Sequence, residues 1–371
     1  MPTGGRRLSS HVDEDAPTVE PLPVSENNRR ESPGLLSVWL FIVAALVLIM
    51  VVIGGTTRLT QSGLSMVRWE PISGVIPPLN DADWQAEFDS YKAYPEFQKI
   101  NREMTLSEFK GIFFWEYLHR LIGRLLGLAL AVPFLFFLVR RAIPNGYGWR
   151  LAGLVCLVGL QGLIGWWMVS SGLVDRPDVA HERLAVHLAA ALLLLIATLW
   201  TALDLRALSH GQTRVEGRPS RWIWPFASLL TVQIIMGAFV AGLDAGRIFN
   251  TWPLMHGALF PKGIGELSPI WSNFVDNPIG VQFVHRWLGL VVALSGLAVA
   301  VQLFRAGAKT QATALEVAVL VQFILGVVTL LNAVPVALGV AHQAGGTLLV
   351  VVTVFAAHWS LGGARRTENA D

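Results

Sequence analysis

The chain has 371 residues, of which 53% are hydrophobic and 15% are charged, and its formal net charge is +2. Soluble domains spend about a quarter of their residues on charged side chains. The apolar excess therefore predicts contact with lipid, and it excludes a disordered chain and a nucleic-acid binder. The single cysteine, Cys156, excludes an internal disulfide, and the absence of a CxxCH motif excludes a covalently attached haem.

Apolar segments long enough to cross a bilayer as helices, which takes roughly 20 residues each, occur eight times. They lie at about 35–55, 113–139, 149–171, 184–205, 221–243, 280–304, 312–333 and 338–361. Because a bilayer core offers no partner to unpaired backbone groups, the sequence predicts an all-α integral membrane protein.

The distribution of lysine and arginine predicts how the helices are oriented. The loops after the second, fourth and sixth spans are rich in arginine, and both tails carry arginines as well. Positively charged loops stay on the cytoplasmic side. Both termini are therefore expected in the cytoplasm, and the long loop 58–112 is expected outside.

A set of motifs occurs twice along the chain in the same order. EYLHR at 116–120 returns as QFVHR at 282–286, and Gln161-x3-Gly165 returns as Gln322-x3-Gly326. This order predicts two pseudo-equivalent four-helix bundles with the same orientation. The expected domains are a disordered cytoplasmic tail (1–34), an N-terminal bundle (35–205), a cytoplasmic linker (206–220), a C-terminal bundle (221–361) and a cytoplasmic tail (362–371).

Each expected bundle carries two histidines near the outer ends of its second and fourth spans. These are His119 and His187 in the first bundle and His285 and His342 in the second. Ionisable residues within spans are costly and mark function. A single interfacial histidine is most often only hydrogen-bonded, but two matched pairs favour the two axial positions of a haem iron. Zinc would need further ligands.

The two halves differ at the residue three before the first histidine, which is Glu116 in one half and Gln282 in the other. Residues three apart share a helix face, so Glu116 is expected to point into the site of His119. A carboxylate can take a proton or stabilise positive charge, whereas an amide cannot. The difference predicts chemistry in the first half and a permanent cofactor in the second; a solvated interfacial glutamate is the alternative.

Arginine follows the histidine in both halves, as Arg120 and Arg286. Two interpretations stay open for this pair. The guanidinium groups either position the helices at the membrane interface or pair with haem propionates, for which their forked geometry is suited.

Several long motifs resemble the heme A synthase family, in the variant shared by alpha-proteobacteria and mitochondria. The resemblance covers residues 35–361 and includes GGTTRLTQSGLSM (54–66), EFKGIFFWEYLHRLIGR (108–124), FNTWPLM (249–255) and AHQAGG (341–346). It implies oxidation of the C8 methyl group of heme O to a formyl group, by two successive hydroxylations followed by dehydration, for cytochrome c oxidase assembly. The chain departs from the family at His256, where an acidic residue is usual.

The resemblance also implies a role for each candidate. His285 and His342 would be the axial ligands of a bound heme b, His119 and His187 would face the substrate haem, and Glu116 would be the carboxylate needed for oxidation. The implied location is the bacterial inner membrane, in contact with its lipid. The implied partners are a heme O synthase and a redox partner, and homo-oligomerisation stays open. A competing interpretation is a transmembrane electron carrier with two fixed haems and no special role for Glu116.

Overall fold

The computed structural model describes residues 31–70, 73–211 and 222–360. Most of the expected tail 1–34, most of the linker 206–220 and all of the tail 362–371 lie outside these residues. Within the described ranges there is no β-strand, and eight helices are long and apolar enough to cross a membrane. The predicted all-helical class and the eight spans are confirmed.

The eight long helices lie close to the predicted spans. They are α1 (Pro33–Leu59), α4 (Leu106–Val139), α5 (Gly148–Ser170), α6 (His181–Ser209), α7 (Ile223–Gly242), α8 (Pro278–Arg305), α9 (Lys309–Leu331) and α10 (Val336–Ser360). The largest shift is in α4, which begins seven residues before the expected start at 113. Thr105 and Glu108 form a capping box there, in which each side chain bonds the other residue's main-chain N–H. This reciprocal capping satisfies two free donors and starts the helix early.

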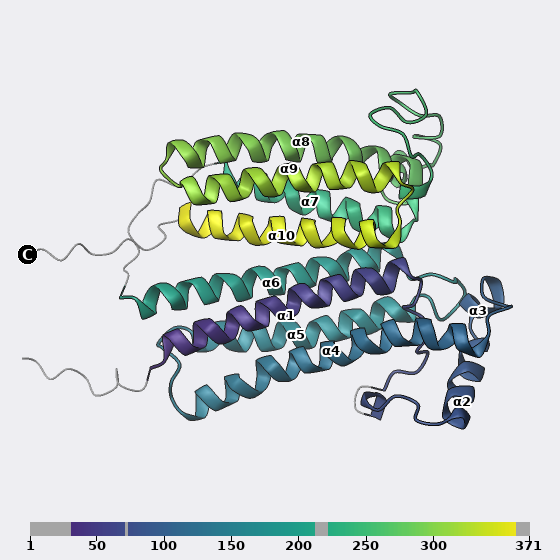
Figure 1. The fold of residues 1–371 in the computed structure, drawn as a ribbon, viewed down its shortest axis with the longest axis horizontal. Helices are drawn as coiled ribbons and strands as arrows, with labels where there is room; N and C mark the ends of the chain where they lie inside the picture. Colours follow the sequence, from purple (N-terminus) through teal and green to yellow (C-terminus); the bar gives the residue numbers. More distant parts are fainter. Residues whose placement is uncertain (1–30, 71–72, 212–221, 361–371) are drawn as a thin grey trace, which may run out of the picture.

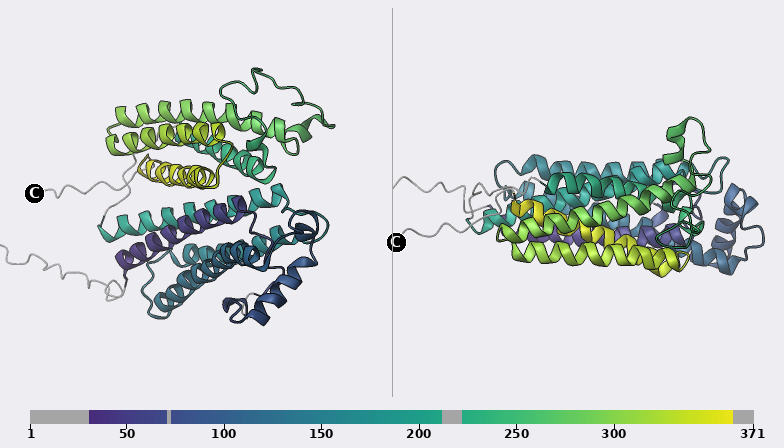
Figure 2. Two further views of the ribbon diagram at one scale, coloured as in Figure 1. Left: turned by 45° about the vertical axis from the view of Figure 1, so that its right-hand side comes forward. Right: turned by 90° about the horizontal axis from the view of Figure 1, so that it is seen from above.

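The helices form two groups of four that lie side by side (Figures 1 and 2). In the first group α1 contacts α4 and α6, and α5 contacts the same two helices. In the second group α7 contacts α8 and α10, and α9 contacts the same two helices. Thus α1, α4, α5 and α6 correspond in order to α7, α8, α9 and α10.

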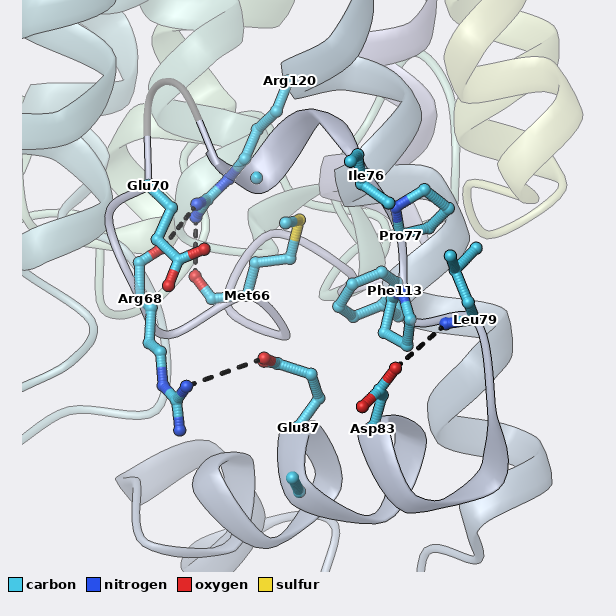
Figure 3. Close-up of a pocket in the computed structure, with 13 residues that line it drawn as sticks. Met66, Arg68, Glu70, Ile76, Pro77, Leu79, Asp83, Glu87, Phe113 and Arg120 are labelled. Atoms are coloured by element: carbon cyan, nitrogen blue, oxygen red, sulfur yellow. Dashed lines mark hydrogen bonds and ion pairs between the residues drawn. The ribbon is translucent and has the colours of Figure 1, made fainter.

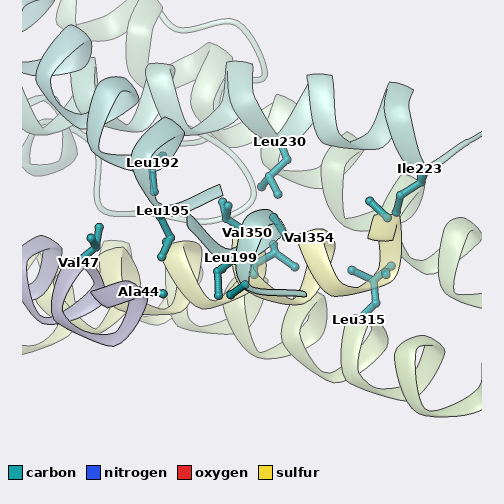
Figure 4. Packing of buried hydrophobic residues seen from close by; sticks show 14 of the residues in the cluster. Ala44, Val47, Leu192, Leu195, Leu199, Ile223, Leu230, Leu315, Val350 and Val354 are labelled. Carbon is teal, nitrogen blue, oxygen red and sulfur yellow. The ribbon is translucent and has the colours of Figure 1, made fainter. Parts of the chain in front are cut away.

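A shared core of buried aliphatic residues lies where the two groups meet (Figure 4). Leu195 and Leu199 of α6 and Val47 of α1 belong to it, together with Leu230 of α7 and Val354 of α10. Lipid chains are as apolar as these side chains, so close packing rather than exclusion of water holds the halves together.

The segment 58–112, expected as a loop, folds into a small helical unit at one end of the bundles (Figure 1). It contains a short 3-10 helix η2 (Ser73–Val75), α2 (Asp81–Lys92) and α3 (Pro95–Lys99). Phe88 and Tyr91 of α2 pack on Phe109 and Phe113 of α4 and form a second, aromatic core. Two more 3-10 helices, η3 (Ala245–Arg247) and η4 (Ile270–Phe274), lie between α7 and α8.

Candidate functional site

The four candidate histidines form two facing pairs, one in each group of helices. His119 of α4 faces His187 of α6 with ring centres 6.5 Å apart, and His285 of α8 faces His342 of α10 with ring centres 6.4 Å apart. All four are half-buried. The structure therefore brings together the pairs that the sequence repeat predicted.

The spacing of each pair fits one metal between two imidazoles. A metal–imidazole nitrogen bond is about 2 Å long, so two rings on opposite sides of one metal have centres roughly 6 Å apart. Among the described residues, no three His, Cys, Asp or Glu side chains gather into a group that could hold a bare metal ion. A haem iron, which has four ligands of its own, fits these sites better than zinc.

A glycine on the neighbouring helix faces each imidazole. A Cβ atom on Gly54, Gly165, Gly237 or Gly326 would lie 2.9, 3.0, 3.0 or 2.8 Å from Cε1 of the facing histidine. Cβ atoms very seldom come this close to another heavy atom. The absence of a side chain at these four glycines therefore gives room for the imidazole rings.

The glutamines of the same motifs hold the main chain of three histidines. Nε2 of Gln161, Gln233 and Gln322 donates to the main-chain oxygen of His187, His285 and His342, each at 3.0 Å. The three Oε1 atoms, and Nδ1 of His119 and His285, are buried without a hydrogen-bond partner in the described part of the chain. Unpaired buried polar atoms gathered in this way are typical of functional sites.

Glu116 is buried and is held on both of its oxygens. Oε2 accepts hydrogen bonds from Oγ of Ser65 and the main-chain N–H of Met66, each at 2.7 Å, and Oε1 accepts from Arg120 at 2.6 Å. Its exposed fraction is 3%, which excludes the solvated interfacial glutamate. The carboxylate lies one turn from His119 and against the loop that follows α1, an arrangement that the sequence did not predict.

Arginines on the same face of α4 hold that loop as well. Arg120 donates to the main-chain oxygens of Met66 at 2.7 Å and Arg68 at 3.0 Å, and Arg124 donates to that of Glu70 at 2.7 Å. Residues 116, 120 and 124 thus clamp the loop 65–70 onto α4.

The second half has an equivalent clamp without a carboxylate. Gln282 donates to the main-chain oxygen of Phe249 at 3.1 Å, and Arg286 donates to that of Thr251 at 2.6 Å and also to Phe249. Both arginines therefore hold a loop against the helix that carries them. Their pairing with haem propionates stays a prediction.

A pocket of about 350 Å³ lies between the clamped loop and α2 (Figure 3). Arg120 and Phe113 of α4 line it together with Met66 and the Arg68–Glu87 ion pair, whose N···O distance is 4.0 Å. Charges of both signs surround it, so the pocket has no evident preference for an anion.

His181 is a polar residue at the junction of the halves that the sequence analysis did not single out. Its ring lies 5.5 Å from that of Phe239, and its Nε2 lies 3.3 Å from a carboxylate oxygen of Asp276. The fourth span was expected to begin at 184, which left this histidine outside it. His358 bonds Asp204 at 3.0 Å, and the ring of His256 packs edge-on against that of Phe249, with ring centres 4.9 Å apart.

The region that aligns with known proteins includes nearly all of the described helices. The family model described as "Cytochrome oxidase assembly protein" matches residues 37–354. The chain is 49% identical to a heme A synthase of Sphingopyxis alaskensis over 326 residues, which cover 88% of this chain and 92% of that protein. It is 47% identical to a heme A synthase of Caulobacter vibrioides over 329 residues, which cover 86% and 95%. The protein thus belongs to the cytochrome oxidase assembly protein family.

Proposed function

We propose that this protein is a heme A synthase, a membrane oxidoreductase that converts the C8 methyl group of heme O into the formyl group of heme A. The observation that carries the proposal is a pair of matched histidine sites of which, among the residues that the structure describes, only one has a buried carboxylate beside it. The names of relatives that align with most of the chain support the same activity.

The two sites divide the work between a substrate and a resident cofactor. His119 and His187 hold the substrate haem, and His285 and His342 hold a heme b. Redox chemistry at the iron is supplied by the haem groups when they are bound. The protein's own part is to fix the imidazoles, which the facing glycines and the glutamine amides do in both halves.

Glu116 supplies the negative charge for oxidation in the first half. Its carboxylate is oriented by Ser65, Met66 and Arg120 before any substrate arrives. A charge fixed in a site of low dielectric stabilises opposite charge far better than water does. The carboxylate oxygens of Glu116 therefore stabilise positive charge that develops at the oxidised carbon, or accept the proton that this carbon loses.

The proposal places the protein in the bacterial cell membrane, beside a source of heme O and a redox partner. Eight membrane-spanning helices suit a substrate with the solubility of haem, which reaches the sites from lipid. A heme O synthase is the expected supplier.

Extraction of the non-covalent haems from purified protein tests the proposal. We expect heme b together with heme O, heme A or a hydroxylated intermediate, resolved by chromatography and mass. Replacement of His285 or His342 by alanine is expected to remove the heme b and leave the other haems. Heme b alone, at two per chain, would overturn the proposal and favour the electron carrier.

A further inference from the structure

The four imidazoles are held in one repeated arrangement, and one of the four departs from it. In α5, α7 and α9 a glutamine stands four residues before the glycine that faces the histidine. In α1 the residue four before Gly54 is Met50. His119, which faces Gly54, is therefore the one candidate ligand whose neighbouring helix carries no glutamine at this position.

Met50 corresponds to Gln233 in space as well as in sequence. Gly123 and Gly289 follow His119 and His285 by four residues in the two halves. A Cβ atom on Gly289 would lie 3.1 Å from Nε2 of Gln233, and one on Gly123 would lie 3.7 Å from Cε of Met50. The two side chains thus reach equivalent points on α4 and α8.

The glutamine ties two helices together at the level of the imidazole. Gln233 joins α7 to α8 by its bond to the main-chain oxygen of His285, at 3.0 Å. A thioether has no hydrogen to donate, so Met50 cannot form the equivalent bond to His119. The side-chain hydrogen bonds seen between α1 and α4 lie elsewhere, from Thr57 to Trp115 and from Trp39 to Ala129.

A synthase needs two haem sites with different rates of release. The substrate haem must leave after every reaction, whereas the resident haem must stay. With a haem held between the imidazoles, its release would need them to move apart, which would be easier where the helix that carries the imidazole is less firmly attached to its neighbour. In the second half both histidines have a glutamine bond, while in the first half only His187 has one.

We propose that Met50 makes the first-half site the one that exchanges haem, by withholding from His119 the hydrogen bond that holds the other three histidines. The inference rests on the proposed function and deepens it. Met50 and Gln233 act through His119 and His285, so both are positioning residues.

The reciprocal exchange Met50→Gln and Gln233→Met, each in the full-length protein, tests the proposal. Met50→Leu is the matched control, because leucine is similar in volume to methionine and likewise cannot donate. Haem release from the purified proteins is followed by transfer to excess apomyoglobin. The haem that remains is extracted and identified, so that heme b reports the second half and heme O with heme A reports the first.

We expect Met50→Gln to slow the release of heme O and heme A by about two- to tenfold, the range of one neutral hydrogen bond. Met50→Leu is expected to release them at the rate of the unaltered protein, and Gln233→Met to speed the release of heme b by a similar factor. Gln233→Met takes a polar group out of an apolar bundle, so it provides a test even if Met50→Gln does not fold.

Two outcomes would overturn the inference: equal release rates from the Met50→Gln and Met50→Leu proteins, or an unchanged rate of heme b release from Gln233→Met. Unaltered protein that yields heme b as its only haem would instead refute the proposed function. The identity of the extracted haems thus separates the failure of one proposal from the failure of the other.

Discussion

Glu116 and Gln282, at equivalent positions of the two halves, differ by a single charge. The Glu116 carboxylate accepts three hydrogen bonds, while the equivalent Gln282 donates one and leaves its Oε1 unpaired within the described residues. Glutamine therefore folds into the same kind of clamp without the charge. The substitution Glu116→Gln separates the structural part of this residue from its electrostatic part.

We expect Glu116→Gln to keep a normal complement of bound haem and to lower heme A formation by about 100- to 1,000-fold, as loss of a preorganised electrostatic group does. Conversion is measured by chromatography of the extracted haems. Ser65→Ala is the control, because it removes one hydrogen bond to the carboxylate and keeps the charge. Heme A formation should fall much less in Ser65→Ala than in Glu116→Gln. Normal heme A yield in Glu116→Gln would show that the carboxylate only holds the loop.

Glu96 is a second buried carboxyl group, in the helical unit outside the bundles. Burial raises the pKa of Glu96 to about 8, from an ordinary value of 4.5. Its Oε2 accepts a hydrogen bond from the Tyr91 hydroxyl at 3.0 Å. Because the unfolded chain ionises this group at lower pH than the folded one, the unit loses stability as pH rises from about 4.5 to 8 and loses no more above that range.

The substitution Glu96→Gln is expected to remove this pH dependence, because the amide stays neutral and still accepts the Tyr91 bond. Hydrogen-exchange protection of residues 81–104, compared between the two proteins at each pH, measures the effect. The protection of the variant should equal that of the unaltered protein near pH 4 and exceed it increasingly up to pH 8. A constant difference across this range would contradict the assignment of the buried charge to Glu96.

At the scale of helices, the facing glycines set how closely each imidazole lies to its neighbouring helix. A Cβ atom on Gly326 would lie 2.8 Å from Cε1 of His342, so alanine there forces the ring to move. Gly162, on α5, has no atom within 4 Å of its Cβ position. The two glycines therefore form a test and a control for the same substitution.

Gly326→Ala is expected to weaken heme b binding by about 10- to 100-fold, the range seen when a group that orients a metal ligand is lost. Gly162→Ala should leave haem binding unchanged. The haem absorption of protein titrated with heme b measures both. Equal affinity in the two variants would mean that the glycine does not position His342.

The sequence predicted the long spans well and the short helices α2 and α3 not at all. The long spans and the histidine pairs followed from hydropathy and from an internal repeat, which are regular over many residues. The helices α2 and α3 are short and polar, and their core depends on a contact of Phe88 and Tyr91 in α2 with Phe109 in α4, which hydropathy does not predict. The early start of α4 had a local signal in Thr105 and Glu108. The relation of Met50 to Gln233 had none, because the repeat was traced by residue identity and here the identity changes.

At the scale of the whole molecule, one turn of α1 touches both histidine sites. Gly54 packs against His119, and the next residue, Gly55, packs against Gln343, the neighbour of His342. Gln343 also donates to the main-chain oxygen of Val51 at 2.9 Å. Arg58, one turn further, pairs with Asp244 of the second half at 3.3 Å.

Gly55→Ala is expected to alter both sites at once. Its Cβ would lie 2.6 Å from Oε1 of Gln343 and 3.0 Å from Nε2, the atom that donates to Val51, so the end of this side chain must shift. The helix itself gains about 0.5–1 kcal/mol from the loss of a glycine. Faster release of heme b and of heme O in the apomyoglobin assay would show the effect. Gly127→Ala, on α4 with open space at its Cβ position, is the control. A changed release rate for one haem alone would contradict the expectation that this turn acts on both sites.

This shared turn limits how far the two halves can diverge in evolution. Duplicated units ordinarily change independently once each has its own task, and the Glu116 and Gln282 pair shows that these two have done so. Gly54, however, contacts a histidine of the first half and Gly55 a glutamine of the second, so a substitution that shifts this turn is expected to act on both histidine sites. Mutations in this turn should therefore be epistatic with residues of α10, and suppressors of a Gly55 defect are expected near Gln343 rather than within the first half.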